Sequence, residues 1–166
     1  MDEFFKIPSI VSPGAAILLS PLDWGLGHAA RMIPLVKALL MAGCRVTLAA
    51  NGPQKHLLGE AFPSLECLSP PDYQVKYRKN RAATIASLVL AIPRLQSVIR
   101  QETVWLAKTL EKRQFDLVIS DNRYGFCHAT VTSVFITHQL RPRTAFGSRV
   151  DGMLQRRLYT YIDRFT

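Results

Sequence analysis

Five short apolar runs divide this chain, and between them apolar residues recur every three or four positions. The runs lie at 15–20 (AAILLS), 45–50 (RVTLAA), 65–68, 117–120 (LVIS) and 134–137 (VFIT). Continuous apolar runs of this length are typical of strands buried on both faces, as in a parallel sheet covered by helices. We therefore expect about five strands, mostly parallel.

The stretches between the runs have helical periodicity. Residues 28–42 place Met32, Val36, Leu39 and Leu40 on one face, and Gly43 follows where a left-handed cap would end the helix. Further helices are expected at 54–61, at 84–112 with a break or kink near Pro93, and from 150 to the last residue.

This order of elements predicts an α/β fold. A strand, a helix and a second strand within about 35 residues make a right-handed βαβ unit. We expect a Rossmann-like, doubly wound, mostly parallel sheet at 15–166, preceded by a loose lead-in at 1–14. The link between residues 120 and 134 is barely long enough for a helical crossover, so a loop or a single turn is expected there.

Charge is uneven along an otherwise ordinary globular composition. Residues 1–75 hold five Lys/Arg and six Asp/Glu, whereas 76–166 hold sixteen and six. A basic half indicates contact with phosphates, anionic lipid or nucleic acid, or else a solvated basic surface. One basic string precedes an apolar helix start and resembles a patch for anionic membranes, with a solvated helix cap as the alternative; it consists of Lys76, Arg78, Lys79 and Arg81.

The cysteines and the apolar segments exclude several classes of protein. Cys44, Cys67 and Cys127 form no CxxC pair, which argues against a disulfide framework and a structural zinc site. The longest uncharged apolar stretch, 82–92, is shorter than the ~20 residues of a membrane span. The first residues are acidic, unlike a signal peptide. We expect a cytoplasmic protein, peripheral at the inner face of the membrane if the basic string binds lipid.

Polar clusters follow three of the expected strands. Because ligands of open parallel sheets bind beyond the carboxyl ends of the strands, these clusters should meet at one rim. They are Asp23-Trp24-Gly25-Leu26-Gly27-His28-Ala29-Ala30-Arg31 after the first strand, Asp121-Asn122-Arg123-Tyr124-Gly125 after the fourth and His138-Gln139 after the fifth.

The glycine turn fits an anion or a hydroxyl-rich ligand better than a dinucleotide. Gly25-x-Gly27-x-x-Ala30 matches the dinucleotide fingerprint in form. Four residues separate the strand from Gly25, however, and Asn51 stands where a ribose-binding carboxylate is expected. Both departures argue against a nicotinamide or flavin cofactor.

Two histidines and one acidic residue at this rim have alternative readings. His28 at a helix start is suited to remain neutral and act as a general base, or it caps and packs the helix. His138 at a strand end usually satisfies a backbone group. If Asp121 has only a structural role, it is expected to pair with Arg123. His56 and His128 have no supporting neighbours in the sequence and are expected to be structural or exposed.

The first two clusters carry a family resemblance. Gly25-Leu26-Gly27-His28-Ala29-Ala30-Arg31, followed by Pro34 and Leu35, resembles the acceptor-side glycine loop of MurG-like glycosyltransferases, which add N-acetylglucosamine to the lipid-linked peptidoglycan precursor. The run from Asp116 to Gly125, together with Val134 to Leu140, is similar to related uncharacterised bacterial glycosyltransferases. The likeness covers residues 15–166, which is half of such an enzyme. The glycine loop of the peptidoglycan enzymes is richer in glycine than this one, which leaves the acceptor open.

The resemblance implies a GT-B fold of two Rossmann-like domains with the site between them. It implies an inverting, metal-independent hexosyltransferase with no cofactor, in which a nucleotide sugar, commonly a UDP-sugar, is a co-substrate. His28 would be the base, Gly25, Gly27 and Arg31 would lie at the substrates, and the cleft would be lined by Asp121, Asn122, Arg123, His138 and Gln139. The C-terminal donor-binding domain lies outside this chain, so we expect the chain alone to be inactive.

Two other functions remain open from the residues alone. One is a Rossmann-type nucleotide- or dinucleotide-binding protein, which saturable NAD(P)H binding would support. The other is a non-catalytic basic domain that binds membrane or nucleic acid. The charge favours this second function, but the chain has no recognisable nucleic-acid motif and no aromatic platform among its basic residues.

Overall fold

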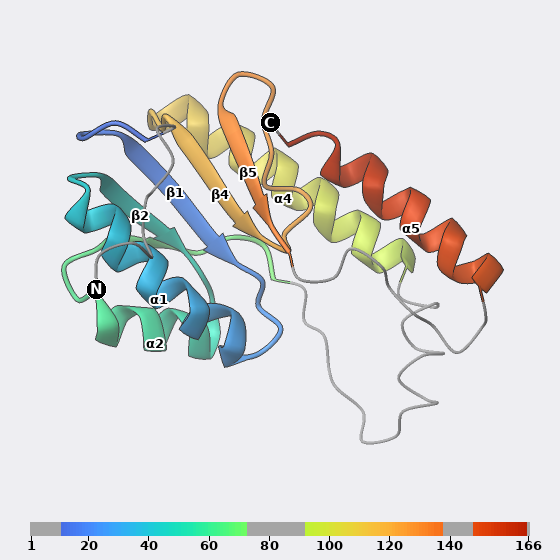
Figure 1. Cartoon of the computed structure of the whole chain (residues 1–166), viewed down its shortest axis with the longest axis horizontal. Helices are drawn as coiled ribbons and strands as arrows, with labels where there is room; N and C mark the ends of the chain where they lie inside the picture. Colours follow the sequence, from blue (N-terminus) through green and yellow to red (C-terminus); the bar gives the residue numbers. More distant parts are fainter. Residues whose placement is uncertain (1–10, 73–91, 138–147, 166) are drawn as a thin grey trace, which may run out of the picture.

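A five-stranded, wholly parallel sheet forms the centre of the molecule. In a computed structural model, which describes residues 11–72, 92–137 and 148–165, the strand order is β3-β2-β1-β4-β5 (Figure 1). The strands are β1 (Ala16–Pro21), β2 (Arg45–Ala49), β3 (Cys67–Leu68), β4 (Leu117–Asp121) and β5 (Thr132–Ile136). Strand order reverses at β1, and this is the doubly wound, Rossmann-like topology expected from the sequence.

Four described helices cover the two faces of the sheet. They are α1 (Leu26–Met41), α2 (Gly52–Ala61), α4 (Ile92–Lys112) and α5 (Ser148–Ile162). Helices α1 and α2 lie together on one face, α4 runs behind the sheet, and α5 lies beside it, past β5 (Figure 1). The expected helix at 84–112 is confirmed from Ile92 onward, with Pro93 in the first turn of α4, and the part before Ile92 lies outside the described residues.

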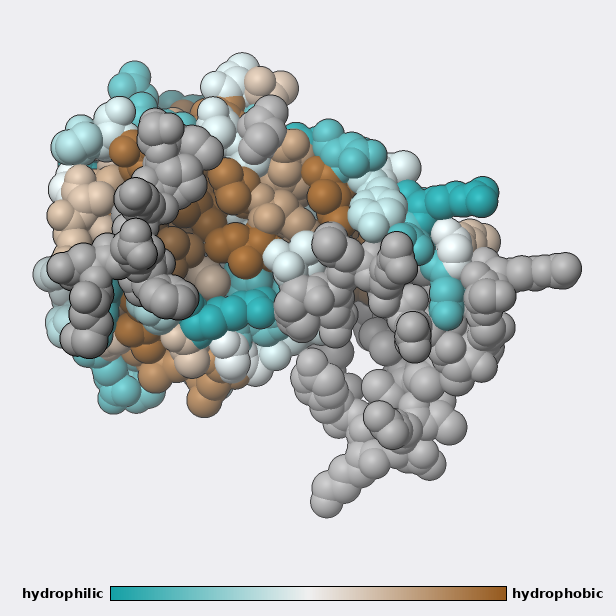
Figure 2. All heavy atoms as spheres, viewed as in Figure 1, coloured by the Kyte–Doolittle hydropathy of each residue, from teal (hydrophilic) through white to brown (hydrophobic). Residues whose placement is uncertain are grey.

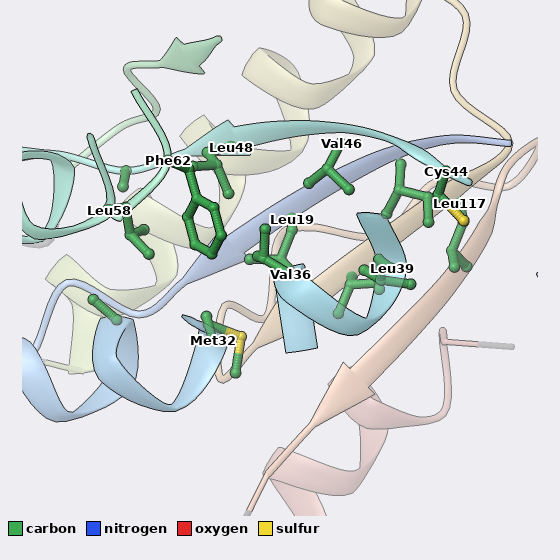
Figure 3. Close-up of a cluster of buried hydrophobic side chains, with 14 residues drawn as sticks. Leu19, Met32, Val36, Leu39, Cys44, Val46, Leu48, Leu58, Phe62 and Leu117 are labelled. Atoms are coloured by element: carbon green, nitrogen blue, oxygen red, sulfur yellow. The ribbon is translucent and has the colours of Figure 1, made fainter. Parts of the chain in front are cut away.

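The larger core lies between α1, α2 and the sheet. Leu19 and Leu48 point from β1 and β2 toward Val36 and Leu39 of α1, and Phe62 closes the cluster beside them (Figure 3). These side chains are almost fully buried, and each contributes about 1.5–3 kcal/mol to stability. The apolar face predicted for 28–42 therefore packs on the sheet through Met32, Val36 and Leu39. Leu40, which was expected on the same face, is exposed.

The second core lies under α4. Leu18 and Val118 alternate with the residues of the first core along β1 and β4, and they pack with Leu106 and Phe126. Strands with both faces buried read as continuous apolar runs, because successive side chains enter different cores. This explains why β1 and β4 carry no polar alternation.

Helix α1 ends where the sequence predicts. Gly43 has a φ of 79°, and its N–H donates to the Leu40 carbonyl oxygen at 3.0 Å. The next amide, that of Cys44, donates to the Leu39 carbonyl oxygen at 3.0 Å. A left-handed residue here lets two free carbonyl groups be satisfied before the chain enters β2.

The link from β4 to β5 is a loop without a helix. Residues 122–131 return the chain to the start of β5, which pairs in parallel with β4 so that Asp121 lies opposite Ile136. Asn122 begins the loop with a φ of 57°, and its N–H donates to the Ile136 carbonyl oxygen at 3.0 Å. The expected loop or single turn is confirmed as a loop, closed by a bridge between His128 and Val131.

Helix α5 packs on the far edge of the sheet through aromatic side chains. Tyr124 and Phe135 lie with ring centroids 5.0 Å apart, Tyr161 lies 6.0 Å from Tyr124, and Phe165 lies 4.8 Å from Phe135. Burial raises the pKa of the Tyr124 phenol, so this ring stays neutral in ordinary solution. Tyr161 of α5 and Phe165, which follows the helix, thus hold this end of the chain against Tyr124 and Phe135.

The surface is mixed in character. Figure 2 shows apolar residues gathered over the middle of the face in view and hydrophilic residues towards its outer parts. Among the helices that the structure describes, none is both long and apolar enough to cross a bilayer. The described residues also contain no group of three His, Cys, Asp or Glu side chains arranged to hold a metal ion.

Candidate functional site

The glycine turn after β1 opens helix α1 at the carboxyl edge of the sheet. Gly25 precedes the first helical residue with a φ of 90°, a conformation that other residues rarely adopt. A Cβ atom at Gly25 or Gly27 would meet nothing within 4 Å, so the space beside this turn is open. The turn therefore leaves room at a helix N-terminus, where backbone N–H groups favour anions.

The side chain of Gln54, in α2, forms hydrogen bonds with the backbone of this glycine turn. Its side-chain Nε2 donates to the carbonyl oxygens of Leu22 and Gly25, at 2.5 and 2.7 Å. Gln54 is almost fully buried, and in α2 it stands one turn before the buried Leu58. The glycine turn is thus fixed by an amide of the neighbouring helix and does not rely on its own short sequence.

His28 and Asp121 meet at the edge between β1 and β4. The Nδ1 atom of His28 lies 2.9 Å from Oδ2 of Asp121, although the two residues are separated by 93 positions in the sequence. The histidine comes from the first turn of α1 and the aspartate from the last position of β4, next to Pro21 of β1. The imidazole is 14% exposed and the carboxylate is fully buried.

Arg31 binds the same carboxylate. Its Nε donates to Oδ2 of Asp121 at 2.9 Å, and its Nη2 donates to Oδ1. Since Arg31 follows His28 by three positions, both side chains leave α1 on the same face. The Arg31 side chain is 33% exposed and the Asp121 side chain is fully buried, so solvent reaches this ion pair only from the side of the arginine.

The expected pairing of Asp121 with Arg123 is wrong. Residues two apart in a strand point to the same face, and this rule would place the two side chains together. Asn122 breaks the alternation, because its φ of 57° reverses the chain just after β4. Asp121 consequently faces α1, whereas Arg123 turns to the opposite face and meets α4.

Arg123 enters a buried network and not the open side of the site. Its Nε donates to Oε1 of Glu102 at 2.8 Å, and both side chains are fully buried. The other oxygen of Glu102 accepts the N–H of Gly125 at 3.0 Å. The guanidinium also donates to the carbonyl oxygens of Pro21 and Pro71. Arg123 thus links α4 to the ends of β1 and β4 through hydrogen bonds. It does not line the cleft, where it was expected from the sequence.

The remaining residues singled out from the sequence divide into a group that the structure describes and a group that it does not. Asn122 is buried at the turn, and its side-chain amide lies 3.4 Å from Oδ1 of Asp121. His56 is exposed beside Glu60, and His128 contacts Thr130, as expected for residues outside the site. The second group lies outside the described residues and comprises His138, Gln139, Lys76, Arg78, Lys79 and Arg81.

The end of β2 carries no acidic side chain toward the glycine turn. Asn51 precedes α2, and its side-chain amide donates to the Pro70 carbonyl oxygen at 2.6 Å. A dinucleotide-binding fold of the usual kind has a ribose-binding carboxylate at this position. In this chain, Asn51 at that position forms a hydrogen bond with the loop after β3.

Two residues at this edge of the sheet, Glu102 and Gln54, were not identified from the sequence. The sequence around Glu102 did indicate a buried charge. Glu102 lies between Ile99 and Leu106 on the buried face of α4. A carboxylate in an apolar helical stripe indicates a buried charge that needs a cationic partner. Gln54 carried no comparable signal, because an amide one turn before a leucine is common on exposed helices.

Comparisons with known proteins give only remote likenesses. No family model matches the chain, and no curated protein matches it. Among solved structures, MurG of Acinetobacter baumannii is similar with a TM-score of 0.48 and 16% identity, over 87% of this chain and 39% of MurG. The glycosyltransferase of kitacinnamycin is similar with a TM-score of 0.38 and 19% identity, over 65% of this chain and 25% of that enzyme.

A third similar structure has a different described activity. The C-terminal domain of the PF1911 hydrogenase from Pyrococcus furiosus has a TM-score of 0.44 and 14% identity, over 95% of this chain and 92% of that domain. The chain thus spans well under half of either glycosyltransferase and nearly all of the hydrogenase domain. At these scores the likenesses do not decide an activity, which has to be argued from the site.

Proposed function

We propose that this chain is the acceptor-side half of a glycosyltransferase in which His28 is the general base. The observation that carries the proposal is the imidazole of His28 on the Asp121 carboxylate, beside the open glycine turn. A carboxylate behind a neutral imidazole fixes its tautomer and stabilises the imidazolium that forms when the ring takes a proton. This arrangement is suited to activate a hydroxyl group.

The proposed reaction transfers a hexosyl group from a nucleotide sugar, such as a UDP-sugar, to a hydroxyl of the acceptor. His28 accepts the hydroxyl proton at Nε2 while the acceptor oxygen forms a bond to the anomeric carbon. The bond from that carbon to the phosphate oxygen breaks, and the nucleoside diphosphate leaves with the electron pair. Attack from the face opposite the leaving group inverts the anomeric centre.

The glycine turn supplies a second element of the proposal. Negative charge grows on the departing diphosphate, and the backbone N–H groups and dipole at the start of α1 favour negative charge nearby. The open space beside Gly25 and Gly27 gives a phosphate or a sugar hydroxyl close access to the backbone. The donor-binding side is assigned to a second domain, so the 166-residue chain alone is expected to give no useful turnover.

The proposal is tested by comparing His28→Ala with His56→Ala in the longest form of the protein that its native source produces. Each form is assayed for transfer from a panel of nucleotide sugars to a hydroxyl acceptor. We expect His28→Ala to lower the rate by about 10²–10⁴, the usual contribution of a general base. His56 is exposed and pairs with Glu60, so its removal controls for the loss of a histidine as such.

Three results would each contradict a different part of the proposal. An undiminished rate in His28→Ala would show that His28 is not the base, while leaving the transferase activity standing. A lack of transfer from every nucleotide sugar, in the native form as well as in the 166-residue chain, would contradict the activity itself. Robust turnover by the 166-residue chain would show that no second domain is needed.

A further inference from the structure

Three arginine side chains gather on one face of α5, the helix that lies past β5 (Figure 1). Arg156 and Arg157 belong to the helix, Arg164 follows its end, and all three are exposed. The positions 153, 156–157, 160–161 and 164 recur every three or four residues, so their side chains share one face of the helix. They border an open hollow of about 420 Å³, which is lined by Met153, Arg156, Arg157, Thr160, Tyr161 and Arg164.

The arginines of this hollow lack the carboxylate partners that other arginines of the chain have. Three arginines elsewhere each bind a carboxylate directly. Arg156, Arg157 and Arg164 form no ion pair with any residue that the structure describes. No acidic side chain is among the described residues that line the hollow. Like charges this close repel one another, so an anion bound between them is stabilised by all three.

Tyr161 attaches one end of the hollow to the sheet. Its ring lies 6.0 Å from that of Tyr124, which in turn lies 5.0 Å from the ring of Phe135 in β5. The guanidinium carbon of Arg164 lies 5.1 Å from the centre of the Tyr161 ring, within the range of a cation–π interaction. The N–H of Arg164 also donates to the Tyr161 carbonyl oxygen at 3.3 Å. One of the three cations is thus held in place before a ligand binds, which lowers the entropic cost of binding.

The chemistry of the hollow fits a small ligand with more than one phosphate group. Guanidinium groups bind phosphate oxygens through paired hydrogen bonds, and they stay charged throughout the ordinary pH range. Three of them match a diphosphate, whose negative charge is spread over two phosphate groups, better than a single carboxylate. The volume also falls in the range of about 300–1,000 Å³ that is usual for sites of small ligands.

A membrane surface or a nucleic acid fits this face less well. A helix that lies in a membrane interface inserts a broad apolar face into the lipid. In the described part of α5, Met153 is the one large apolar side chain that is exposed, and Tyr161 packs toward the sheet. Single-stranded nucleic acids stack their bases on free aromatic rings, whereas the Tyr161 ring already carries Arg164.

We propose that the hollow on α5 is a binding site for a small ligand that carries a diphosphate or several phosphate groups. Arg156 and Arg157 contact the phosphates from the helix, and Arg164 contacts them from beyond its end. The hollow shares no residue with the glycine turn, and neither His28 nor Asp121 lines it. The site therefore does not depend on the proposed function.

The test is isothermal titration of the chain with inorganic pyrophosphate, with the ionic strength held constant by sodium chloride. We expect one saturable site with a Kd of about 1 mM or lower, and weaker binding of inorganic phosphate. Arg157→Gln and Arg164→Gln should each raise the Kd about tenfold, as for the loss of one charge-assisted hydrogen bond. Arg157→Lys keeps the charge but lacks the planar fork, so its Kd should lie between those of wild type and Arg157→Gln.

Controls separate this site from a general effect of positive charge. Arg113→Gln removes the same charge from an exposed arginine that pairs with Glu66 and does not line the hollow, so its Kd should equal that of wild type. Urea denaturation of each variant shows that it is folded. Vesicles of phosphatidylglycerol, with phosphatidylcholine as the neutral reference, distinguish a lipid surface from a small ligand as the source of the phosphate.

Four outcomes would overturn the inference. The first is a lack of saturable binding of pyrophosphate, and the second is a Kd that is unchanged in folded Arg157→Gln and Arg164→Gln. The third is equal affinity for inorganic phosphate and pyrophosphate, which would make the hollow a general anion site. The fourth is binding to phosphatidylglycerol vesicles without binding to pyrophosphate, which would make this face of α5 a membrane contact.

Discussion

Two carboxylate–arginine pairs flank the carboxyl end of β4, and they differ in their access to solvent. In the pair of Glu102 and Arg123, on the side of α4, both side chains are fully buried. In the pair of Asp121 and Arg31, on the side of α1, the carboxylate is buried but the guanidinium is one-third exposed. The same two chemical groups thus pair twice beside the end of one strand, on opposite faces of the sheet.

The difference shows how location separates a structural ion pair from a site. The guanidinium of Arg123 is directed at Glu102 and at backbone carbonyl groups, which leaves it no route to a ligand. The Asp121 pair includes an imidazole and borders the open glycine turn. Charge pairing alone is therefore no indication of function, and the open side is what makes the Asp121 pair a candidate.

The largest expected effect comes from removing the charge of the buried pair. Glu102→Gln keeps the shape of the side chain but leaves the Arg123 guanidinium buried without a counter-charge. We expect the free energy of unfolding to fall by about 3–5 kcal/mol, a large share of the ~5–15 kcal/mol of a typical domain. Urea denaturation of the purified chain measures this loss.

The matched variant at the other pair is Asp121→Asn. Its loss should be smaller, because the exposed side of Arg31 can hydrogen-bond with water once the carboxylate is gone. Equal losses for Glu102→Gln and Asp121→Asn would show that exposure does not separate the two pairs.

A smaller effect is expected from adding a methyl group beside the buried pair of Glu102 and Arg123. In Gly125→Ala the new Cβ would lie 2.4 Å from the Ile99 carbonyl oxygen and 2.5 Å from Cβ of Glu102. Overpacking of this kind costs about 1–3 kcal/mol. Gly59→Ala is the control, since a Cβ there meets nothing within 4 Å and alanine favours the helix. Thermal melting should show a lower midpoint for Gly125→Ala only, and equal midpoints would mean that the Glu102 network is not tightly packed.

The smallest effect is expected at the exposed pair of Arg113 and Glu66, which extends the comparison to the surface. The hydrogen bond from Arg113 holds the pKa of Glu66 below its usual value. A folded-state pKa below the unfolded one stabilises the fold above the unfolded pKa, and this contribution is lost as the pH falls through the folded pKa. Wild type should therefore exceed Arg113→Gln slightly in stability at neutral pH, and the gap should close in acid and shrink with salt. If the difference in stability between wild type and Arg113→Gln does not change with pH, the effect arises from packing of the aliphatic part of Arg113 and not from the ion pair.

Much of the fold and part of the site could be predicted from the sequence. The five apolar runs, the periodicity of 28–42 and the position of Gly43 correspond to strands, helix and cap within one or two residues. The meeting of the first and fourth strand ends at one edge also followed, because parallel strands all end on the same side. These features depend on local patterns of apolar residues and turn residues along the chain.

The partners of the charged residues could not be read from the sequence. Asp121 and Arg123 stand two positions apart, and only the positive φ of Asn122 sends them to opposite faces. The partners that they acquire lie 90 positions away for Asp121 and Arg31, and 21 positions away for Arg123 and Glu102. No local pattern encodes contacts over such separations.

By itself, then, the sequence determined where strands and helices form, the parallel class of the sheet and the edge at which polar residues gather. It does so because hydrophobic periodicity and turn residues act over a few positions. Only the tertiary structure decided which arginine meets which carboxylate, and hence that His28 shares Asp121 with Arg31 while Arg123 is closed off by Glu102. The physical reason is that ion pairing depends on distance and burial in space, and both are set by the packing of helices on the two faces of the sheet.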